Sequence, residues 1–450
     1  MATRISRANG TPTLTTKCTF SAWVKRSDSA INNSGRDGGI IETYTGANDY
    51  GWIRFDGSNQ IQIYARNSSG NLIVCDTSAK FRDVSAWYHI VAVFDSTEST
   101  ASNRVKLYVN GELQTFQGSP IYPNSSAEVW FNRASATFNI GNSEKYTSNF
   151  QFDGQYSHVH FIDGAVYQAS TFGSTDATTG EWQINTSPTI TEYGANGFFL
   201  FKDDASLNDD SGKGNNFTLN SGSVQKTEDN PSNNFATLNP LINPDVGNRS
   251  TYSNGNLKGN TTSAGHISGI STMAVNEGKF YCESKSGSSG SGHVFGVIQA
   301  NKNIKGTDPQ DFSGLYGVSA DGTRYVAGTQ TSSWGGSYTY NNIMGLALDM
   351  DASPPKLHIH YNGSYSNGSG AYNQTFDNSV PITLAADETY HFFFGDNTSS
   401  GTYDHQVNFG NGYFATTAIS SEGTNASGHG KFEYDVPTGY TALCTKGLNE

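Results

Sequence analysis

Alternating apolar and polar residues predict antiparallel β-strands along the whole chain, and residues 86–112 show the pattern most clearly. In residues 88–94 both alternating sets are largely apolar or aromatic, which indicates a strand buried on one face and packed at least partly on the other. In residues 105–109 one set is apolar and the other is mixed. The Asn110-Gly111 pair that follows tolerates positive φ, so it predicts a hairpin turn. These residues therefore predict a meander of antiparallel sheet.

Similar short runs fill the rest of the sequence and predict an all-β fold. Strands of about 5–6 residues at a spacing of roughly 8–12 residues are typical of a sandwich or jelly roll. No stretch keeps a 3.6-residue period, and residues 168–173 are the best helix candidate. The further predicted strands are 14–26, 40–44, 50–55, 60–65, 71–76, 138–141, 150–167, 278–284, 293–298, 315–318, 325–327, 342–351, 356–361, 390–395 and 407–409.

The length of 450 residues favours two domains. We expect two antiparallel β-sandwiches, over residues 1–220 and 263–450. Residues 221–262 between them are rich in Asn, Pro and Ser, and three Asn-Pro pairs favour extended backbone there. We expect an extended linker that lies against one or both domains and is anchored by Phe235, Leu238 and Leu241.

Composition excludes several classes of protein. The net charge is −13, and the sequence contains no basic patch of the kind that nucleic-acid binding needs. No run of about 18 apolar residues exists, so we expect no membrane insertion. The N-terminus lacks the apolar region of a secretory signal, so we expect synthesis in a cytoplasm without export. The four cysteines form no CxxC pair. Buried free thiols are the preferred interpretation, with one disulfide in each half left open: Cys18, Cys75, Cys282 and Cys444.

The sequence favours binding over catalysis. Glycoside hydrolysis needs two carboxylates that flank the scissile bond, and Glu433 with Asp435 is the nearest approach to such a run. The serine-rich stretch 287–292 lacks the strand–turn–helix context of a nucleophile elbow. We therefore expect no enzymatic activity. Two His-x-His pairs, at residues 158–160 and 358–360, indicate sheet surface more strongly than a metal pair.

Aromatic residues in polar loops are the candidate glycan or partner contacts. A sugar platform needs an exposed ring with amides or acids around it, and residues 334–342 combine Gly, Tyr and Asn in this way. Packing of such a loop over the end of a sheet is the alternative. The candidates, which we expect to be exposed, are Trp334, Tyr338, Tyr340, Tyr50 and Trp52.

The first half resembles laminin-G-like, concanavalin-A-like jelly rolls. The runs that carry the resemblance, in family order, are Phe20–Lys25, Trp87–Asp95, Leu107–Gly111 and Phe152–Val159. Further runs resemble structural proteins of tailed phages, especially marine ones: His160–Gly164, Phe172-Gly, Gly180–Trp182, Gly194–Phe201 and Asp210–Phe217. The family usually has another strand before Phe20, so we expect residues 198–201 or 217–219 to return and pair near the N-terminus.

The second half resembles a SPRY-like sandwich. The matching runs are Gly278–Glu283, Phe295–Val297, Met344–Asp351, Leu357–Gly363 and Asn408–Gly410, and the closing run Pro437–Cys444 looks like that of phage virion proteins. Together the resemblances imply an exterior virion protein of a tailed phage. The implied role is a tail fibre or another host-attachment component that binds cell-surface glycans in a lectin-like way.

Two alternatives stay open: a capsid-decoration or tail-adaptor protein that binds other virion proteins, and a glycan-depolymerising enzyme. The resemblance implies as partners a host glycan or receptor, other virion proteins and further copies of the chain, with a trimer as in many fibre proteins. The implied location is the particle exterior.

Calcium is the one cofactor that the resemblance suggests, and none is required. Laminin-G-like domains often bind calcium through Asp side chains at one rim. A solvated turn whose Asx side chains cap their own backbone is the alternative. The candidate ligands are Asp153, Asp203, Asp204, Asp209 and Asp210.

Overall fold

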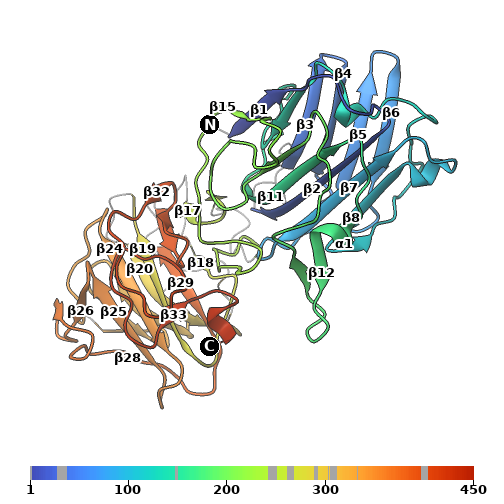
Figure 1. Cartoon of the computed structure of the whole chain (residues 1–450). Helices are drawn as coiled ribbons and strands as arrows, with labels where there is room; N and C mark the ends of the chain where they lie inside the picture. The colour runs from blue at the N-terminus through green and yellow to red at the C-terminus, as the bar shows by residue number, and fades with distance from the viewer. Residues whose placement is uncertain are drawn as a thin grey trace. The chain divides into compact units, whose positions relative to one another are not determined.

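A computed structural model describes residues 3–27, 38–146, 150–241, 251–260, 268–287, 292–302, 304, 312–331, 333–396 and 404–449. The chain divides into two compact units, Met1–Lys226 and Thr227–Glu450. The colour bar of Figure 1 runs from blue through green for the first unit and from yellow to red for most of the second.

The first unit is a sandwich of two antiparallel sheets. The seven-stranded sheet has the order β15 (Thr218–Ser221), β1 (Arg4–Ala8), β10 (Thr137–Ile140), β3 (Gly38–Gly46), β4 (Asp49–Phe55), β5 (Ile61–Asn67), β6 (Gly70–Asp76). The six-stranded sheet has the order β14 (Phe198–Leu200), β11 (Gly154–Asp163), β2 (Lys17–Arg26), β7 (Tyr88–Asp95), β8 (Val105–Val109), β9 (Glu112–Leu113).

Strand alternation places one set of side chains between these sheets. Ile53 and Phe55 of β4 meet Phe20 of β2 and Ile90 and Phe94 of β7 in one buried cluster. The second set on β7 packs on the outer side of its sheet. The expectation that this strand is packed on both faces is therefore confirmed. The predicted hairpin is also present, because Asn110 and Gly111 have φ values of 49° and 81° between β8 and β9.

The N-terminal strand lies inside its sheet. β1 pairs with β10 on one side and with β15 on the other, so that Ser6 faces Asn139 and Thr218. The expectation that residues 217–219 return to the N-terminus is confirmed. The alternative segment, β14, pairs with β11 instead.

A buried carboxylate joins distant loops beside this core. Asp163 is 2% exposed and accepts hydrogen bonds from Thr13 N at 2.8 Å and Asn196 N at 2.9 Å. Asn132 Nδ2, in the 3-10 turn Trp130–Asn132, donates to the same carboxylate. Burial of a charge is tolerated only when such donors surround it.

The outer face of the six-stranded sheet is covered by the chain between β11 and β14. This segment contains the helix α1 (Ala169–Phe172), which confirms the predicted position, and the hairpin of β12 (Gly173–Thr175) and β13 (Trp182–Ile184). Phe172 and Trp182 pack on Val91 and Val93 of β7. Figure 1 shows α1 and the β12 hairpin beside β8.

The second unit is another sandwich. Its ten-stranded sheet joins β16 (Thr251–Ser253), β17 (Lys258–Asn260), β30 (Asp404–Asn408), β19 (Lys279–Lys285), β24 (Ile343–Asp349), β25 (Lys356–Tyr361), β26 (Ser364–Ser366) and β27 (Tyr372–Gln374), with β28 (Ile382–Thr383) on β25 and β33 (Thr441–Ala442) parallel to β19. The six-stranded sheet is β18 (Ser268–Ile270), β29 (Tyr390–Asp396), β20 (His293–Gln299), β21 (Leu315–Ser319), β22 (Arg324–Val326) and β23 (Thr329–Thr331). β31 (Tyr413–Phe414) and β32 (Thr417–Ala418) form a separate ribbon.

A second buried carboxylate fixes the C-terminal segment of this unit. Glu283 on β19 is fully buried and accepts hydrogen bonds from Glu433 N, Tyr434 N and Tyr281 Oη at 2.8–3.0 Å. Burial raises the pKa of Glu283 to about 7. His360 Nδ1 accepts from Gly363 N, so its proton lies on Nε2, which contacts Tyr281 Oη at 2.6 Å.

The expected linker is partly built into this second unit. Phe235 and Leu238 are each 1% exposed, and the isolated bridges Phe235 to Cys444 and Leu238 to Ser271 join them to the sandwich. Both anchors are therefore confirmed. Leu241 is 50% exposed, so its expected role as an anchor is wrong. Residues 242–250 and 261–267 of the expected linker lie outside the described residues.

All four cysteines are buried, and no disulfide joins any two of them. Each lies in an apolar cluster: Cys18 and Cys75 in the first unit's core, and Cys282 and Cys444 in two clusters of the second unit. Among the described residues, no helix has the length and apolar character needed to cross a bilayer.

Buried histidines predict acid sensitivity. Burial lowers the pKa of His89, His360 and His405 to about 3 and that of His158 and His358 to about 4, and the pKa values of His160 and His391 move the same way. As the pH falls below about 6.5, these histidines bind protons in the unfolded chain, whereas they stay neutral in the folded chain. Stability is therefore lost as pH falls below about 6.5, by about 1 kcal/mol per histidine over the first unit of pH.

Urea unfolding at several pH values checks this prediction. Glu283 acts in the opposite direction, because its raised pKa removes stability as pH rises from about 4.5 to about 7. The histidines outnumber it, so we expect the unfolding midpoint to fall steadily between about pH 7 and pH 5. A midpoint that stays constant or rises over that interval would contradict the buried neutral state of these rings.

The Asp163 junction predicts a large stability loss on truncation. Asp163→Ala leaves the amides of Thr13 and Asn196 without their acceptor inside the fold, and we expect a loss of about 3 kcal/mol. Urea unfolding of the purified variant measures it. Asp203→Ala is the matched control: its side chain is 82% exposed, and we expect a change below about 0.5 kcal/mol. Equal effects of the two substitutions would refute the assigned role.

Candidate functional site

Two of the expected aromatic contacts fill the core of the second unit. Trp334 is 2% and Tyr338 is 8% exposed, and both belong to the cluster between its sheets. The Tyr338 hydroxyl accepts a hydrogen bond from Ser286 N and donates to Asn342 O, each at 2.8 Å. The expectation that these rings are exposed is wrong, because their loop folds over the sandwich. Tyr340 is 45% exposed, as expected.

The other two aromatic candidates lie on the outer face of the seven-stranded sheet. Strand alternation directs Tyr50, Trp52 and Arg54 of β4 away from the core, while Ile53 and Phe55 point inward. Tyr50 and Trp52 are 5% and 6% exposed because other rings cover them. The expectation that these two rings are exposed is therefore also wrong.

The covering rings complete a compact aromatic cluster, which we define as Tyr44, Tyr50, Trp52, Tyr64, Tyr146 and Phe150. Trp52 stacks on Tyr50 and Tyr64, with ring centroids 5.0 Å and 4.6 Å apart. Tyr146 stacks on Phe150 at 5.4 Å, and its hydroxyl lies 3.3 Å from that of Tyr50. Tyr146 is 37% exposed, and Tyr44 and Tyr64 are half-buried. The aromatic cluster therefore has a buried base and an accessible upper layer.

Three cations lie around this cluster. The Arg54 guanidinium is 5.1 Å from the Trp52 ring centroid and 4.6 Å from that of Phe150. Arg66 and Lys145 both lie near the Tyr50 ring, at 6.0 Å and 5.5 Å. These are distances at which a ring face attracts a cation.

Glu42 on β3 holds the loop that carries Lys145 and Tyr146. Its buried carboxylate accepts hydrogen bonds from Glu144 N, from Asn139 Nδ2 and from the Ser143 hydroxyl. Ser143 Oγ in turn accepts from Tyr146 N at 2.8 Å. Burial raises the pKa of Glu42, and these hydrogen bonds oppose the shift. The loop position is thus fixed by a chain of contacts that begins on the sheet.

The five sequence candidates included only two members of this site, Tyr50 and Trp52. Its seven other members are Tyr44, Tyr64, Tyr146, Phe150, Arg54, Arg66 and Lys145. A signal existed on β5, where Gln62, Tyr64 and Arg66 alternate with the core residues Ile61, Ile63 and Ala65. It could have placed Tyr64 and Arg66 on one outer face. The local sequence pattern did not predict that Lys145 and Phe150, which belong to a distant loop, would lie on this face.

Carboxylates of the acidic loop after β14 accept hydrogen bonds from nearby backbone amides. Asp209 accepts hydrogen bonds from Phe199 N, Ser211 N and Asn215 N, and Asp204 accepts from Ser206 N. Asp203 lies at the surface near Lys202. Burial, followed by the charge of Asp204, raises the pKa of Asp210. Within the described part of the chain, no three His, Cys, Asp or Glu side chains are grouped so that they could hold a metal ion.

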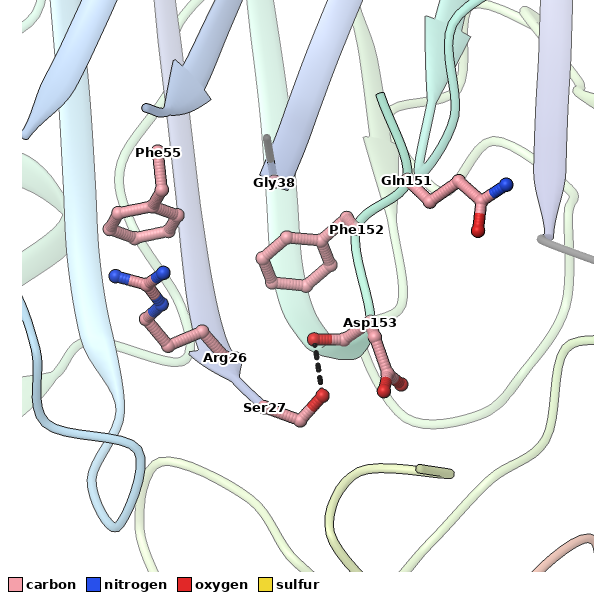
Figure 2. A pocket seen from close by; sticks show the side chains of 7 residues that line it. All are labelled: Arg26, Ser27, Gly38, Phe55, Gln151, Phe152 and Asp153. Carbon is pink, nitrogen blue, oxygen red and sulfur yellow. Dashed lines mark hydrogen bonds between the residues drawn. The ribbon is translucent and has the colours of Figure 1, made fainter. Parts of the chain in front are cut away.

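Asp153 is not brought to that loop but lies at a small pocket before β11. The pocket is lined by Arg26, Ser27, Gly38, Phe55, Gln151, Phe152 and Asp153 and encloses about 180 Å³ including its open mouth. Figure 2 shows the Asp153 carboxylate directed away from the Phe152 ring. The backbone carbonyl oxygen of Asp153 accepts a hydrogen bond from the Ser27 hydroxyl. The cavity proper measures about 10 Å³, which has room for about one water molecule, so this pocket is too small for a saccharide.

Two serine–histidine contacts have geometries that suit a structural role rather than activation of a nucleophile. Trp182 Nε1 donates to His89 Nδ1 at 3.0 Å, so the ring proton lies on Nε2 and points at Ser21 Oγ, 2.9 Å away. His89 therefore cannot take a proton from Ser21 in this state. Ser286 and His293 are in contact at 2.7 Å and are both fully buried.

The acids nearest to a catalytic run also serve loop contacts. Both Glu433 carboxylate oxygens accept hydrogen bonds from Ser420, one from its amide and one from its hydroxyl. Asp435 accepts the amide and hydroxyl of Thr424. These contacts, two from amides and two from hydroxyls, hold the C-terminal loops together.

The first unit matches a known family model. Residues 3–170 match the model named Laminin_G_3, described as the concanavalin A-like lectin/glucanases superfamily. With the two-sheet topology above, this unit is a concanavalin A-like, lectin-like jelly roll. No curated protein matches the chain.

Several solved structures are similar to parts of the chain. The SPRY domain of human HERC1 is 15% identical, with 38% of this chain and 96% of that chain covered and a TM-score of 0.27. The heptameric SAP-like pentraxin of Limulus polyphemus is 14% identical, with coverages of 50% and 88% and a TM-score of 0.32. The CBM40 of Ruminococcus gnavus IT-sialidase, solved with α2,3-sialyllactose, is 13% identical, with coverages of 32% and 73% and a TM-score of 0.24. These TM-scores are low, and the fold assignment rests on topology and the family match.

The buried position of Tyr338 predicts a structural role. Tyr338→Phe leaves Ser286 N without its acceptor in a dry site, and we expect a loss of about 2 kcal/mol in the free energy of unfolding. Tyr340→Phe, two residues away and exposed, should change it by less than about 0.5 kcal/mol. Urea unfolding compares the two variants. Equal stability of Tyr338→Phe and the parent chain would show that water reaches this loop.

Proposed function

We propose that this chain is an exterior structural protein of a tailed-phage virion that attaches the particle to host cells by binding surface glycans. The observation that carries the binding role is the aromatic cluster with its three cations on the outer face of the first sandwich. The virion role is supported by the phage-like runs around residues 160–217 and 437–444. The matched superfamily includes lectins, which agrees with such a role.

The aromatic cluster has the parts that a saccharide site needs. Aromatic faces offer rigid apolar area for the C–H face of a sugar ring, and adjacent polar groups pair with its hydroxyls. Tyr146 supplies the most exposed ring, and Tyr64 supplies a hydroxyl already bonded to Asn71 Oδ1 at 2.8 Å. The buried base of Tyr50 and Trp52 holds these groups in place. Tyr50 and Trp52 thus act as supports under the contact surface.

We infer binding without catalysis and without a required metal. The acids that come nearest to a hydrolytic pair are engaged by Ser420 and Thr424, and Asp209 is engaged by amides of its own loop. Weak contacts at single sites would become strong through copy number in an oligomer, with a trimer as our preferred state. The chain would act on the particle exterior after synthesis in the host cytoplasm.

Tyr146 gives the direct test. Tyr146→Ala removes the exposed ring, and we expect binding of the monovalent chain to glycans stripped from susceptible cells to weaken about tenfold, equivalent to about 1.4 kcal/mol. Tyr146→Phe keeps the ring and should retain most of the affinity. Binding to intact cells, with and without their surface polysaccharide, is measured alongside.

Tyr340→Ala is the matched control, since Tyr340 is the exposed aromatic candidate of the second unit. It should leave binding unchanged. If Tyr340→Ala abolishes binding and Tyr146→Ala does not, the site lies in the second unit. If the folded chain binds no susceptible cell but binds other virion proteins, the capsid-decoration or tail-adaptor role replaces this proposal.

A further inference from the structure

We propose that the aromatic cluster selects an anionic saccharide, one that carries a carboxylate or a sulfate ester, and that Arg66 and Lys145 make the selection. This inference rests on the proposed glycan-binding function and adds the chemical class of the ligand. It stands on the placement of two cations at one aromatic ring.

Lys145 and Arg66 both lie near the Tyr50 ring, and the exposed ring of Tyr146 is next to it. Lys145 Nζ lies 5.5 Å from the Tyr50 centroid and 5.4 Å from the Tyr146 centroid, and the Arg66 guanidinium carbon lies 6.0 Å from Tyr50. Two cations at one ring raise the local positive potential, so an anion bound beside this ring would be attracted to both.

Neither cation has an ion-pair partner among the described residues. Lys145 Nζ donates to the neutral carbonyl of Ala47 at 2.7 Å. Arg66 interacts with the hydroxyls of Tyr50 and Tyr64, but its Nε is buried and has no hydrogen-bond acceptor. A buried donor without an acceptor is uncommon in folded proteins. Nε itself is out of reach of a ligand because it is buried, so contact with a ligand falls to the terminal Nη groups of this half-buried side chain.

Three nearby acids are engaged elsewhere. Glu144 pairs with Arg4 at 3.3 Å, and Glu42 is buried under the hydrogen bonds of its own loop. Asp76 accepts a hydrogen bond from Gln62 Nε2 at 2.6 Å, and Gln62 Oε1 accepts one from Arg54 Nε at 2.8 Å. Asp49, the residue before Tyr50, forms no ion pair with Arg66 or Lys145 among the described residues.

The chemistry of the two cations defines that ligand. A guanidinium pairs with a planar carboxylate or a sulfate through two parallel N–H donors, and an ammonium adds an adaptable point charge. The exposed Tyr146 ring contacts the sugar part of the ligand. A nucleic acid would need a broad basic surface, which the acidic composition excludes.

The test uses an array of matched glycan pairs, each acidic saccharide printed beside its carboxyl-reduced or desulfated form. We expect the parent chain to bind the acidic member of a recognised pair about tenfold more tightly, and to lose this preference at high salt. Arg66→Gln and Lys145→Gln should each lower the preference toward one, measured as the ratio of the affinities for the acidic and the neutral member of the same pair. Arg66→Lys, which keeps the charge without the fork, should restore part of it.

Lys106→Gln is the matched control, because Lys106 lies on β8 of the other sheet and its loss changes the net charge equally. It should leave the preference intact, and thermal unfolding verifies that each variant is folded. The carboxylate and sulfate pairs show which anion is recognised. Equal binding of both members of every recognised pair overturns this inference and leaves glycan binding standing. Absence of binding to any glycan overturns the proposed function and this inference with it.

Discussion

The need to cover both faces of every sheet governs this structure. Strands that are apolar on both faces, such as β7, cannot leave either face in water. The chain between β11 and β14 covers one outer face of the first unit. In the second unit Phe235 and the segment from Phe432 to Cys444 cover another. On the outer face of the other sheet of the first unit, the described residues include the aromatic cluster, whose upper rings stay accessible. The candidate site lies on this face.

Buried carboxylates fix the covering segments in place. Asp163, Glu42 and Glu283 each sit at a strand and accept hydrogen bonds from the backbone of a segment far away in sequence. A buried charge is expensive unless several donors surround it, so each carboxylate specifies one position for its segment. Glu42 has this role for the loop of Lys145 and Tyr146. The same device that stabilises the two sandwiches thus also shapes the site.

The functional proposal follows from this arrangement. The seven-stranded sheet presents aromatic rings and cations on one face. The loop that Glu42 fixes in place adds Tyr146, the most exposed ring. Such a surface suits repeated, weak recognition of saccharides, with avidity supplied by copy number. The first unit is a concanavalin A-like jelly roll, and the second is another sandwich of mainly antiparallel sheets.

The sequence by itself determined the all-β class, the Asn110-Gly111 hairpin, the return of a later segment to the N-terminus and the burial of Phe235, while the choice between residues 198–201 and 217–219 came from the structure. These features follow from local periodicity, turn chemistry and family resemblance. Only the tertiary structure decided the surroundings of each ring. A period of two tells which residues share a face, but not which distant segment covers that face. Tyr50, Trp52, Trp334 and Tyr338 were therefore expected in the open and are buried, whereas Arg66 and Lys145 became visible as a pair only when their loop and strand met.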